Sequence, residues 1–210
     1  ISLYKQKYNA NLWLGVVVTD FTVHRWLVCP DVDAYFVADE KLLRQAGKDV
    51  KIFASGIPVR SAFSEPNEII RVRRGVLDAL GWPVDSFVCL LIGGGEGMLP
   101  MEDIIEELDG ERFKEVHIIA VAGRNGGLRE KLESASSPRL RVFGFVDNMP
   151  QLMQASDAVI TKAGGVSLSE CLACGANILI YHPLPGQEQE NAEFLQKEYG
   201  VATVGDIQQM

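Results

Sequence analysis

The chain has 210 residues, of which 47% are hydrophobic, and a formal net charge of −8 at pH 7. Its length and apolar fraction suit one large globular domain or two smaller ones. The acidic balance argues against a general nucleic-acid-binding protein, because such a protein needs a basic face to displace counterions.

Short apolar runs rich in β-branched residues alternate with helical patterns along the chain, which is typical of parallel βαβ units. The expected strands, in chain order, are 15–19, 34–38, 51–55, 87–92, 116–120, 140–143, 158–161, 178–181 and 202–204. The expected helices are 40–46, 68–80, 100–108, 127–135, 149–155, 166–174 and 188–199. This alternation predicts an α/β fold with a parallel sheet.

The segment 56–66 interrupts the alternation and is interpreted as a linker, because it contains two prolines and has neither strand nor helix period. The residues after it suffice for a nucleotide-binding domain, 58–210, which is expected to be incomplete at its end. The residues before it, 1–57, hold too few strands for a second doubly wound domain. We therefore expect them to be the C-terminal portion of a Rossmann-like domain that is truncated at its N-terminus.

The clearest functional signal is a glycine turn, Lys162-Ala-Gly-Gly-Val-Ser-Leu-Ser-Glu170. Gly164 and Gly165 allow the backbone close to an anion, and the helix that follows directs unpaired N–H groups and its positive dipole end at that charge. Ser167 and Glu170 fall on one helix face, where they can address a sugar or ribose hydroxyl. An ordinary strand-to-helix turn could contain the same residues, so the interpretation needs a second signal.

A second glycine cluster, Gly93-Gly-Gly-Glu-Gly97, follows the expected strand 87–92 and precedes a helix. Open α/β sheets bind ligands at this position. The spacing is neither G-x-G-x-x-G nor a P-loop, which disfavours NAD binding and ATP hydrolysis. Two such turns at one sheet edge predict a diphosphate held by backbone dipoles, with no metal or other cofactor. The alternative is a glycine-rich turn that serves packing alone.

Two further patterns have simple structural explanations. Asp31-Val-Asp33 resembles the D-x-D of metal-dependent sugar transferases, but no further ligand accompanies it, and a solvated turn is expected instead. Cys171-Leu-Ala-Cys174 matches C-x-x-C inside an expected helix. We interpret these cysteines as buried small residues rather than as a zinc or redox site.

The segment Pro185-Gly-Gln-Glu-Gln-Glu-Asn191 places hydrogen-bonding side chains on a loop and on the first turn of the last expected helix. Such a group can read the several hydroxyls of a hexose, which need paired donors and acceptors. Helix capping with acidic residues in the first turn explains the same pattern equally well.

Together, these motifs resemble those of monogalactosyldiacylglycerol synthases and of the bacterial processive diacylglycerol glucosyltransferases. The residues that carry the resemblance are Thr19-Asp-Phe21, Ala54-Ser-Gly-Ile-Pro-Val-Arg60, Gly93-Gly-Gly-Glu-Gly-Met98, Ala122-Gly-Arg-Asn125, Gly144-Phe145, Thr161-Lys-Ala-Gly-Gly165, Glu170, Pro185-Gly-Gln-Glu188 and Asn191. The resemblance implies a GT-B architecture of two Rossmann-like halves. It also implies inverting transfer of a hexose from a UDP-hexose to diacylglycerol, in glycolipid synthesis.

The resemblance further implies which residues form the UDP-sugar site. They are Gly94, Gly95, Gly164 and Gly165 at the diphosphate, backbone groups of Phe145 and Val146 at the uracil, Glu170 at the ribose, Arg124 near the nucleotide, and Gln187, Glu188 and Asn191 at the hexose. On the acceptor side it suggests Asp20, His24 and Trp26. A surface histidine is an equally simple interpretation of His24.

The family's N-terminal half carries a glycine-rich loop and the presumed general base near its beginning, and this sequence contains no counterpart of either. We therefore expect the base upstream of Ile1. An inverting transfer needs that base to take the acceptor's proton, so this chain alone is expected to bind UDP or a UDP-hexose without efficient transfer.

Several alternatives stay open at this point. The donor is either UDP-galactose or UDP-glucose, because a single hydroxyl distinguishes the two. A transferase of peptidoglycan precursor synthesis that uses UDP-N-acetylglucosamine has similar glycine turns, and a non-catalytic UDP-sugar-binding module needs the same pocket. A sugar-nucleotide epimerase would require an acid/base set that the sequence does not offer. The full-length protein is expected in the cytoplasm, attached peripherally to the membrane that holds diacylglycerol.

Overall fold

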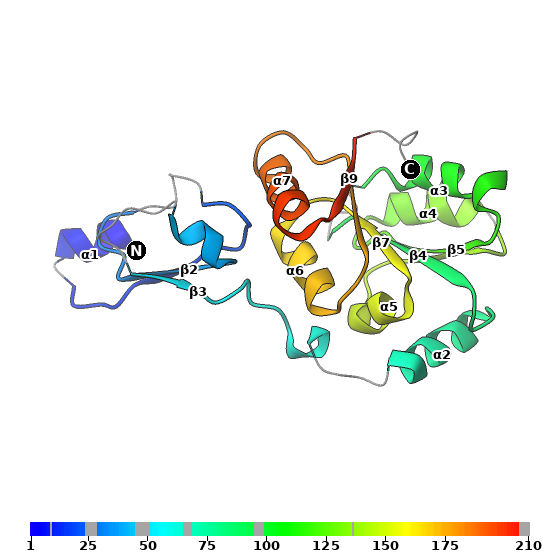
Figure 1. Cartoon of the computed structure of the whole chain (residues 1–210), viewed down its shortest axis with the longest axis horizontal. Helices are drawn as coiled ribbons and strands as arrows, with labels where there is room; N and C mark the ends of the chain where they lie inside the picture. The colour runs from blue at the N-terminus through cyan, green and yellow to red at the C-terminus, as the bar shows by residue number, and fades with distance from the viewer. Residues whose placement is uncertain are drawn as a thin grey trace.

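Two parallel β-sheets organise the chain (Figure 1). This computed structural model describes residues 1–8, 10–23, 29–44, 51–64, 69–94, 99–135 and 137–205. The smaller sheet has the order β1-β2-β3, with strands Gly15–Val17, Ala34–Val37 and Lys51–Ala54. Helix α1 (Ser2–Tyr8) precedes it, and the 3-10 helix η2 (Glu40–Arg44) follows β2.

The larger sheet has six parallel strands in the order β6-β5-β4-β7-β8-β9. They are Phe87–Ile92 (β4), Val116–Val121 (β5), Leu140–Phe143 (β6), Ala158–Thr161 (β7), Ile178–Tyr181 (β8) and Ala202–Val204 (β9). The order runs outward from β4 on one side and from β7 on the other, so the winding reverses between these two strands. A doubly wound sheet binds its ligand outside the carboxyl ends of the strands at this reversal.

Helices cover both faces of the larger sheet. They are α2 (Ile69–Leu80), α3 (Met101–Leu108), α4 (Gly126–Ser134), α5 (Met149–Ala155), α6 (Gly165–Ala173) and α7 (Gln187–Tyr199), with the 3-10 helices η3 (Ser61–Phe63) and η4 (Glu111–Phe113). Successive side chains of β4 enter two different cores: Leu91 packs with α3 and α4, whereas Leu90 packs with α2 and α5. Burial on both faces explains why this strand is a continuous apolar run.

Most expected elements are confirmed, and five strands (β4, β6, β7, β8 and β9) begin and end where the sequence predicts. The expected helix 40–46 is a 3-10 helix that ends at Arg44, and its last two expected residues lie outside the described ones. Helix α1 was not expected. A distant contact holds it, because Lys5 Nζ lies 2.5 Å from Asp33 Oδ2.

The turn expected at Asp31-Val-Asp33 is present, and its second carboxylate, which is 36% exposed, has protein partners as well. Besides the contact with Lys5, Asp33 Oδ2 accepts a hydrogen bond from the Leu14 backbone N–H at 2.6 Å. The hydrogen bond from Lys5, followed by that from Leu14, lowers the pKa of Asp33 below its ordinary value. The carboxylate joins α1 and the start of the smaller sheet to the turn before β2.

The segment 56–66, expected as a linker, buries two apolar side chains in its described part, 56–64. Ile57 is 8% exposed and belongs to the core beneath α6 and α7, whereas Phe63 is 1% exposed and belongs to the core beneath α2 and α5. The apolar residues of this segment enter different cores, so they produce neither a helical nor a strand period. The boundary at residue 57 between two domains stays a prediction.

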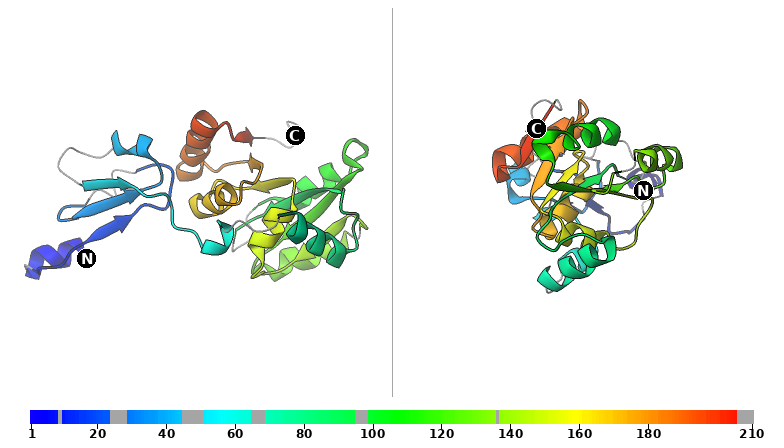
Figure 2. Two further views of the ribbon diagram at one scale, coloured as in Figure 1. Left: turned by 60° about the horizontal axis from the view of Figure 1, so that its bottom comes forward. Right: turned by 90° about the vertical axis from the view of Figure 1, so that its right-hand side faces the viewer.

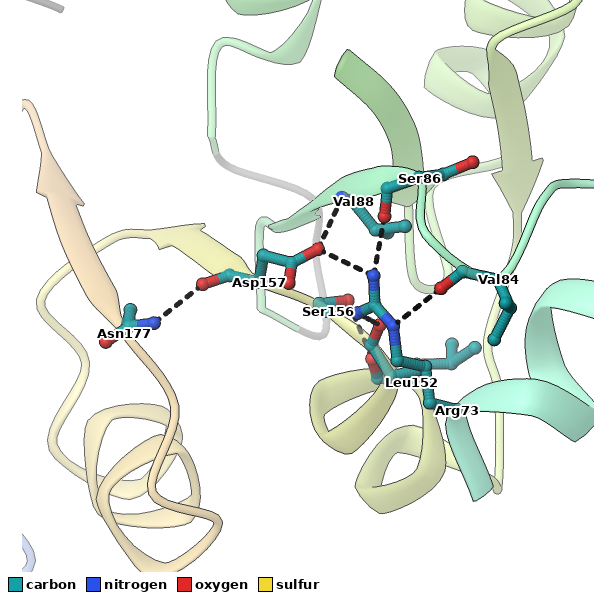
Figure 3. A network of polar contacts seen from close by, with 9 residues as sticks. Arg73, Val84, Ser86, Val88, Leu152, Ser156, Asp157 and Asn177 are labelled. Carbon is teal, nitrogen blue, oxygen red and sulfur yellow. Dashed lines mark hydrogen bonds and ion pairs between the residues drawn. The ribbon is translucent and has the colours of Figure 1, made fainter. Parts of the chain in front are cut away.

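Arg73 of α2 fastens that helix to the amino-terminal edge of the larger sheet (Figure 3). Its guanidinium donates hydrogen bonds to the carbonyl oxygens of Val84 (3.2 Å), Ser86 (2.5 Å) and Ala155 (2.6 Å). It also donates to Asp157 Oδ2 at 3.0 Å. One side chain therefore satisfies backbone acceptors that precede β4 and β7, the two strands at the reversal of the sheet.

Helix α7 contacts the N-terminal part of the chain, and Phe194 packs against the core of the smaller sheet, which lies beside α7 in Figure 1 and in the left view of Figure 2. Near its middle, the ring of Phe194 stacks on Phe21 with centroids 5.9 Å apart. At its end, the Tyr199 hydroxyl donates a hydrogen bond to Asp39, and this bond raises the pKa of Tyr199 to about 12. The middle and the C-terminal end of α7 are thus held by the N-terminal part of the chain.

Candidate functional site

Both glycine turns follow the strands at which the winding of the sheet reverses, β4 and β7. Gly94 has a φ of +73°, a conformation that L side chains rarely adopt, which explains glycine at this position. A Cβ on Gly94 would lie 3.4 Å from Lys162 Cε, so the two turns are neighbours in space. Gly95 lies outside the described residues.

A cavity of about 230 Å³ opens at this point, and residues from both turns line it. Its lining residues are Arg60, Ile92, Gly94, Val121, Gly123, Phe145, Val146, Met149, Ser167 and Glu170. Residues that the sequence predicted at the diphosphate (Gly94), at the uracil (Phe145 and Val146) and at the ribose (Glu170) therefore line one cavity. The lining combines apolar side chains at the carboxyl ends of β4 and β5, Ile92 and Val121, with the polar side chains of Arg60, Ser167 and Glu170.

Phe145 lines this cavity, and Arg124 lies against its ring. The Phe145 ring is 62% exposed, and the Arg124 guanidinium carbon lies 5.3 Å from the ring centroid. A guanidinium at this distance is attracted by the electron-rich ring face. The pair places a cation and a flat aromatic surface together, which suits the stacking of a nucleobase.

Glu170 reaches the same cavity from α6 and faces Arg60. Burial raises the pKa of Glu170 above its ordinary value, and the Arg60 guanidinium opposes this shift. The sequence interpretation did not assign Arg60 to the site. In the sequence, Arg60 ends the segment Ala54-Ser-Gly-Ile-Pro-Val-Arg60, which is one of the motifs of the resemblance. Only the packing of that segment shows that Arg60 lines the same cavity as Glu170.

A second pocket, of about 340 Å³, adjoins the first through the shared residue Ser167. Its lining residues are Thr19, Asp20, Lys162, Ala163, Gly164, Gly165, Val166, Ser167, Gln187, Glu188 and Asn191. The predicted hexose residues thus lie together beyond the glycine turn. Lys162, which was not assigned to the site, adds the positive charge here: its Nζ lies 2.7 Å from Glu188 Oε1.

Gly165 lies against the N-terminal part of the chain. A Cβ on Gly165 would lie 2.1 Å from the Thr19 carbonyl oxygen, which real structures do not permit. A Cβ on Gly164 would meet nothing within 4 Å. Close backbone packing therefore explains the glycine at 165, and its predicted contact with a diphosphate stays a prediction.

Asn191 also has a structural task. Its side chain is fully buried, with Oδ1 accepting from the Phe21 backbone N–H at 2.8 Å. Its Nδ2 donates to Asp20 Oδ1 and to the Ala163 carbonyl oxygen, each at 3.0 Å. The structure thus gives Asn191 protein partners on both sides of its amide, while its predicted contact with a hexose stays a prediction.

Asp20, expected on the acceptor side, lines the second pocket together with the predicted hexose residues. It accepts hydrogen bonds from Asn191 and from the Gln187 side chain. His24 and Trp26, the other two expected acceptor-side residues, lie outside the described residues.

The C-x-x-C cysteines have inert surroundings. Cys171 is fully buried and Cys174 is half-buried, and both are free thiols. Burial raises the pKa of Cys171 to about 12 and that of Cys174 to about 11, so the reactive thiolate is disfavoured at neutral pH.

Within the described part of the chain, no group of three or more His, Cys, Asp or Glu side chains could hold a metal ion. Among the same residues, no helix combines the length and apolar character needed to cross a bilayer.

Comparison with known proteins agrees with the predicted resemblance. Residues 1–59 match the model of monogalactosyldiacylglycerol (MGDG) synthase. The processive diacylglycerol beta-glucosyltransferase of Bacillus subtilis (strain 168) is 33% identical to this chain over 90% of its residues. That of Bacillus pumilus (strain SAFR-032) is 32% identical over 96% of its residues. The chain spans 50% and 53% of their lengths, about half of the curated relatives it matches.

Solved structures share the fold. The crystal structure of Acinetobacter baumannii MurG matches 100% of this chain and 57% of its own, with a TM-score of 0.67 at 15% identity. A UGT transferase from Siraitia grosvenorii, crystallised with UDP, matches 82% of this chain and 45% of its own, with a TM-score of 0.58 at 16% identity. The expected GT-B class of fold is confirmed. Residues 88–207 match the glycosyltransferase family 28 C-terminal domain, and the chain therefore belongs to that glycosyltransferase family.

Proposed function

We propose that this chain is the donor-binding part of an inverting glycosyltransferase that uses a UDP-hexose and diacylglycerol in glycolipid synthesis. One observation carries the proposal. Two adjoining pockets meet at Ser167, one with aromatic, apolar and carboxylate groups and the other with a lysine and three amide or carboxylate side chains of α7. A nucleoside and a hexose joined by a diphosphate need this sequence of environments.

The chemistry of the two pockets follows their residues. Phe145 offers a face for the uracil, and the Glu170 carboxylate can accept from ribose hydroxyls. At the junction, the N-terminus of α6 and the Lys162 ammonium offer positive charge to the diphosphate. Gln187 and Glu188 then face the space where the hexose would lie.

The same groups serve the chemical step. When the glycosidic bond to the diphosphate breaks, negative charge grows on the leaving UDP, and fixed N–H groups and Lys162 stabilise it there. We propose that this stabilisation needs no metal ion. Transfer assayed with the full-length protein should therefore persist in excess EDTA, and a requirement for Mg²⁺ or Mn²⁺ would contradict it.

Diacylglycerol is the acceptor that the relatives favour, since the two curated proteins above carry it in their names. The peptidoglycan-type donor UDP-N-acetylglucosamine and a non-catalytic sugar-binding role receive no comparable support. We also propose that the full-length protein lies in the cytoplasm and attaches peripherally to membranes. Cell fractionation should recover it with membranes and release it with high salt or carbonate instead of detergent.

Calorimetric titration tests donor binding directly. The chain should bind UDP, UDP-glucose or UDP-galactose, and UDP-N-acetylglucosamine more weakly. Glu170→Gln should weaken all of them, whereas Glu106→Gln, an exposed change on α3, should not. A folded protein that binds none of these nucleotides would overturn the proposed function.

A further inference from the structure

Asp20 joins two side chains of α7 that lie far from it in the sequence. One carboxylate oxygen, Oδ1, accepts a hydrogen bond from Asn191 Nδ2 at 3.0 Å. The other, Oδ2, accepts from Gln187 Nε2. The carboxylate is thus shared between two carboxamides on the first two turns of one helix.

The two carboxamides differ in what remains free. Asn191 is fully buried, and its Oδ1 and Nδ2 both have partners in the protein. Gln187 is exposed and lines the second pocket, and its Oε1 has no hydrogen-bond partner within the described part of the chain. Only Gln187 therefore has a polar atom left for a ligand.

The chemistry of a carboxylate decides which atom that is. A carboxylate accepts hydrogen bonds and donates none, so it attracts the NH₂ end of a neighbouring amide. The amide is planar, and its oxygen then lies on the side away from the carboxylate. With Asp20 in place, one of the two Nε2 hydrogens is engaged by the carboxylate, and Oε1 is the acceptor that the amide offers to the pocket.

We propose that Asp20 is a positioning residue for sugar recognition: it fixes the Gln187 amide so that Oε1 accepts a hydrogen bond from one hydroxyl of the donor hexose. The inference rests on the proposed function, because it assumes that a hexose occupies the second pocket. It gives Asp20 a task on the donor side, through Gln187. As a consequence, the pocket should prefer a hexose with a hydroxyl at the one ring position that can donate a hydrogen bond to Gln187 Oε1.

Asp20→Asn is the sharpest variant, because an asparagine keeps the shape but can offer either its oxygen or its NH₂ to Gln187. Calorimetry with UDP and with UDP-glucose or UDP-galactose should show about tenfold weaker binding of the UDP-hexose, the effect of one lost hydrogen bond, with UDP affinity unchanged. Gln187→Ala should show the same pattern, and the double variant should be no weaker than Gln187→Ala alone. Asp103→Asn on the exposed side of α3 removes the same charge and is the matched control.

Modified donors test the direction of the hydrogen bond. A UDP-deoxyhexose and the matching UDP-deoxyfluorohexose, with the change at each hydroxyl in turn, should both bind weakly when the recognised hydroxyl is replaced, because fluorine cannot donate. Gln187→Ala should not distinguish these analogues from the parent sugar. Retained binding of the fluoro analogue at the position where the deoxy analogue binds weakly would overturn the proposal, since Gln187 would then act as a donor.

The outcomes separate this inference from the proposed function. If UDP-hexose binds and Gln187→Ala weakens it while Asp20→Asn does not, the inference falls and the proposed function stands. If Asp20→Asn weakens UDP and UDP-hexose equally, Asp20 is a structural residue only, and the inference also falls. If the unmodified chain binds neither UDP nor a UDP-hexose, both fall.

Discussion

Lys162 Nζ lies 2.7 Å from Glu188 Oε1, and this ion pair joins the end of β7 to the first turn of α7. Both side chains are largely buried, with 26% and 16% of their surfaces exposed. A pair shielded in this way keeps its geometry better than one in open solvent. It holds a cation beside the glycine turn where the proposed diphosphate would bind.

Lys162→Met should weaken the binding of UDP and UDP-hexose by about ten- to a hundredfold, because a hydrogen bond to a charged group contributes about 1.5 to 3 kcal/mol. The loss should shrink at high salt, which screens the same charge. Titration calorimetry at two ionic strengths measures both effects. Lys114→Met is the control. Lys114 is 61% exposed and precedes β5, so it lies at the amino ends of the strands, whereas the glycine turns lie at their carboxyl ends. Equal UDP affinities for the two variants would contradict the role of Lys162.

Gly165→Ala should destabilise the chain by about 1 to 3 kcal/mol, the usual cost of overpacking a filled site. The new Cβ would lie 2.1 Å from the Thr19 carbonyl oxygen and would push the neighbouring Asp20 away from α7. Gly164→Ala is the matched control: its Cβ would meet nothing within 4 Å, and its φ of −75° suits alanine. Urea denaturation followed by circular dichroism should show a lower midpoint for the change at 165 alone. Identical midpoints for the two variants would exclude the close packing described here.

Glu170 should make nucleotide binding depend on pH. Burial raises its pKa above 4.5, so on acidification Glu170 takes a proton at a higher pH than ordinary glutamates do. UDP affinity should therefore fall as the pH is lowered toward that raised pKa, and Glu170→Gln should bind UDP more weakly but without this part of the dependence. Affinities measured at a series of pH values for both proteins check the expectation, and parallel curves would contradict it.

The raised pKa of Glu170 also affects the stability of the chain, and here the effect of pH is opposite to that on UDP binding. A carboxyl whose pKa is raised by folding contributes stability that is present below 4.5 and is lost as the pH rises through the raised value. Glu170→Gln should therefore be at least as stable as the unmodified chain at neutral pH. A lower melting temperature at neutral pH would mean that the carboxylate is structurally required.

Arg73→Met should lower the free energy of unfolding by about 2 to 4 kcal/mol, because the change leaves several acceptors without their donor. The carbonyl oxygens of Val84, Ser86 and Ala155 and the carboxylate of Asp157 would lose this partner (Figure 3). Arg74→Met, at the exposed neighbouring position, should change stability little. Guanidinium denaturation of both variants gives the comparison, and a loss of the same size at position 74 would show that helix charge, not the network, is responsible.

Local sequence patterns predicted the larger sheet well. Strand β4 is an unbroken apolar run because helices cover both its faces, and β7 ends at the glycine turn that the sequence identified. Local patterns say less about the segment around Phe63, because its apolar side chains enter different cores and produce no period.

The sequence by itself determined the α/β class, the two glycine turns and the resemblance to diacylglycerol glycosyltransferases, because these depend on neighbouring residues and fixed spacings. Only the tertiary structure showed that Arg60 faces Glu170, that Lys162 pairs with Glu188, and that Gly165 admits the backbone at Thr19. It also decided what Asn191 and Asp20 do, since each meets partners about 170 residues away. Such contacts arise from how the two sheets pack around α7. Hydrophobic periodicity reflects only neighbouring residues, so it cannot predict this packing.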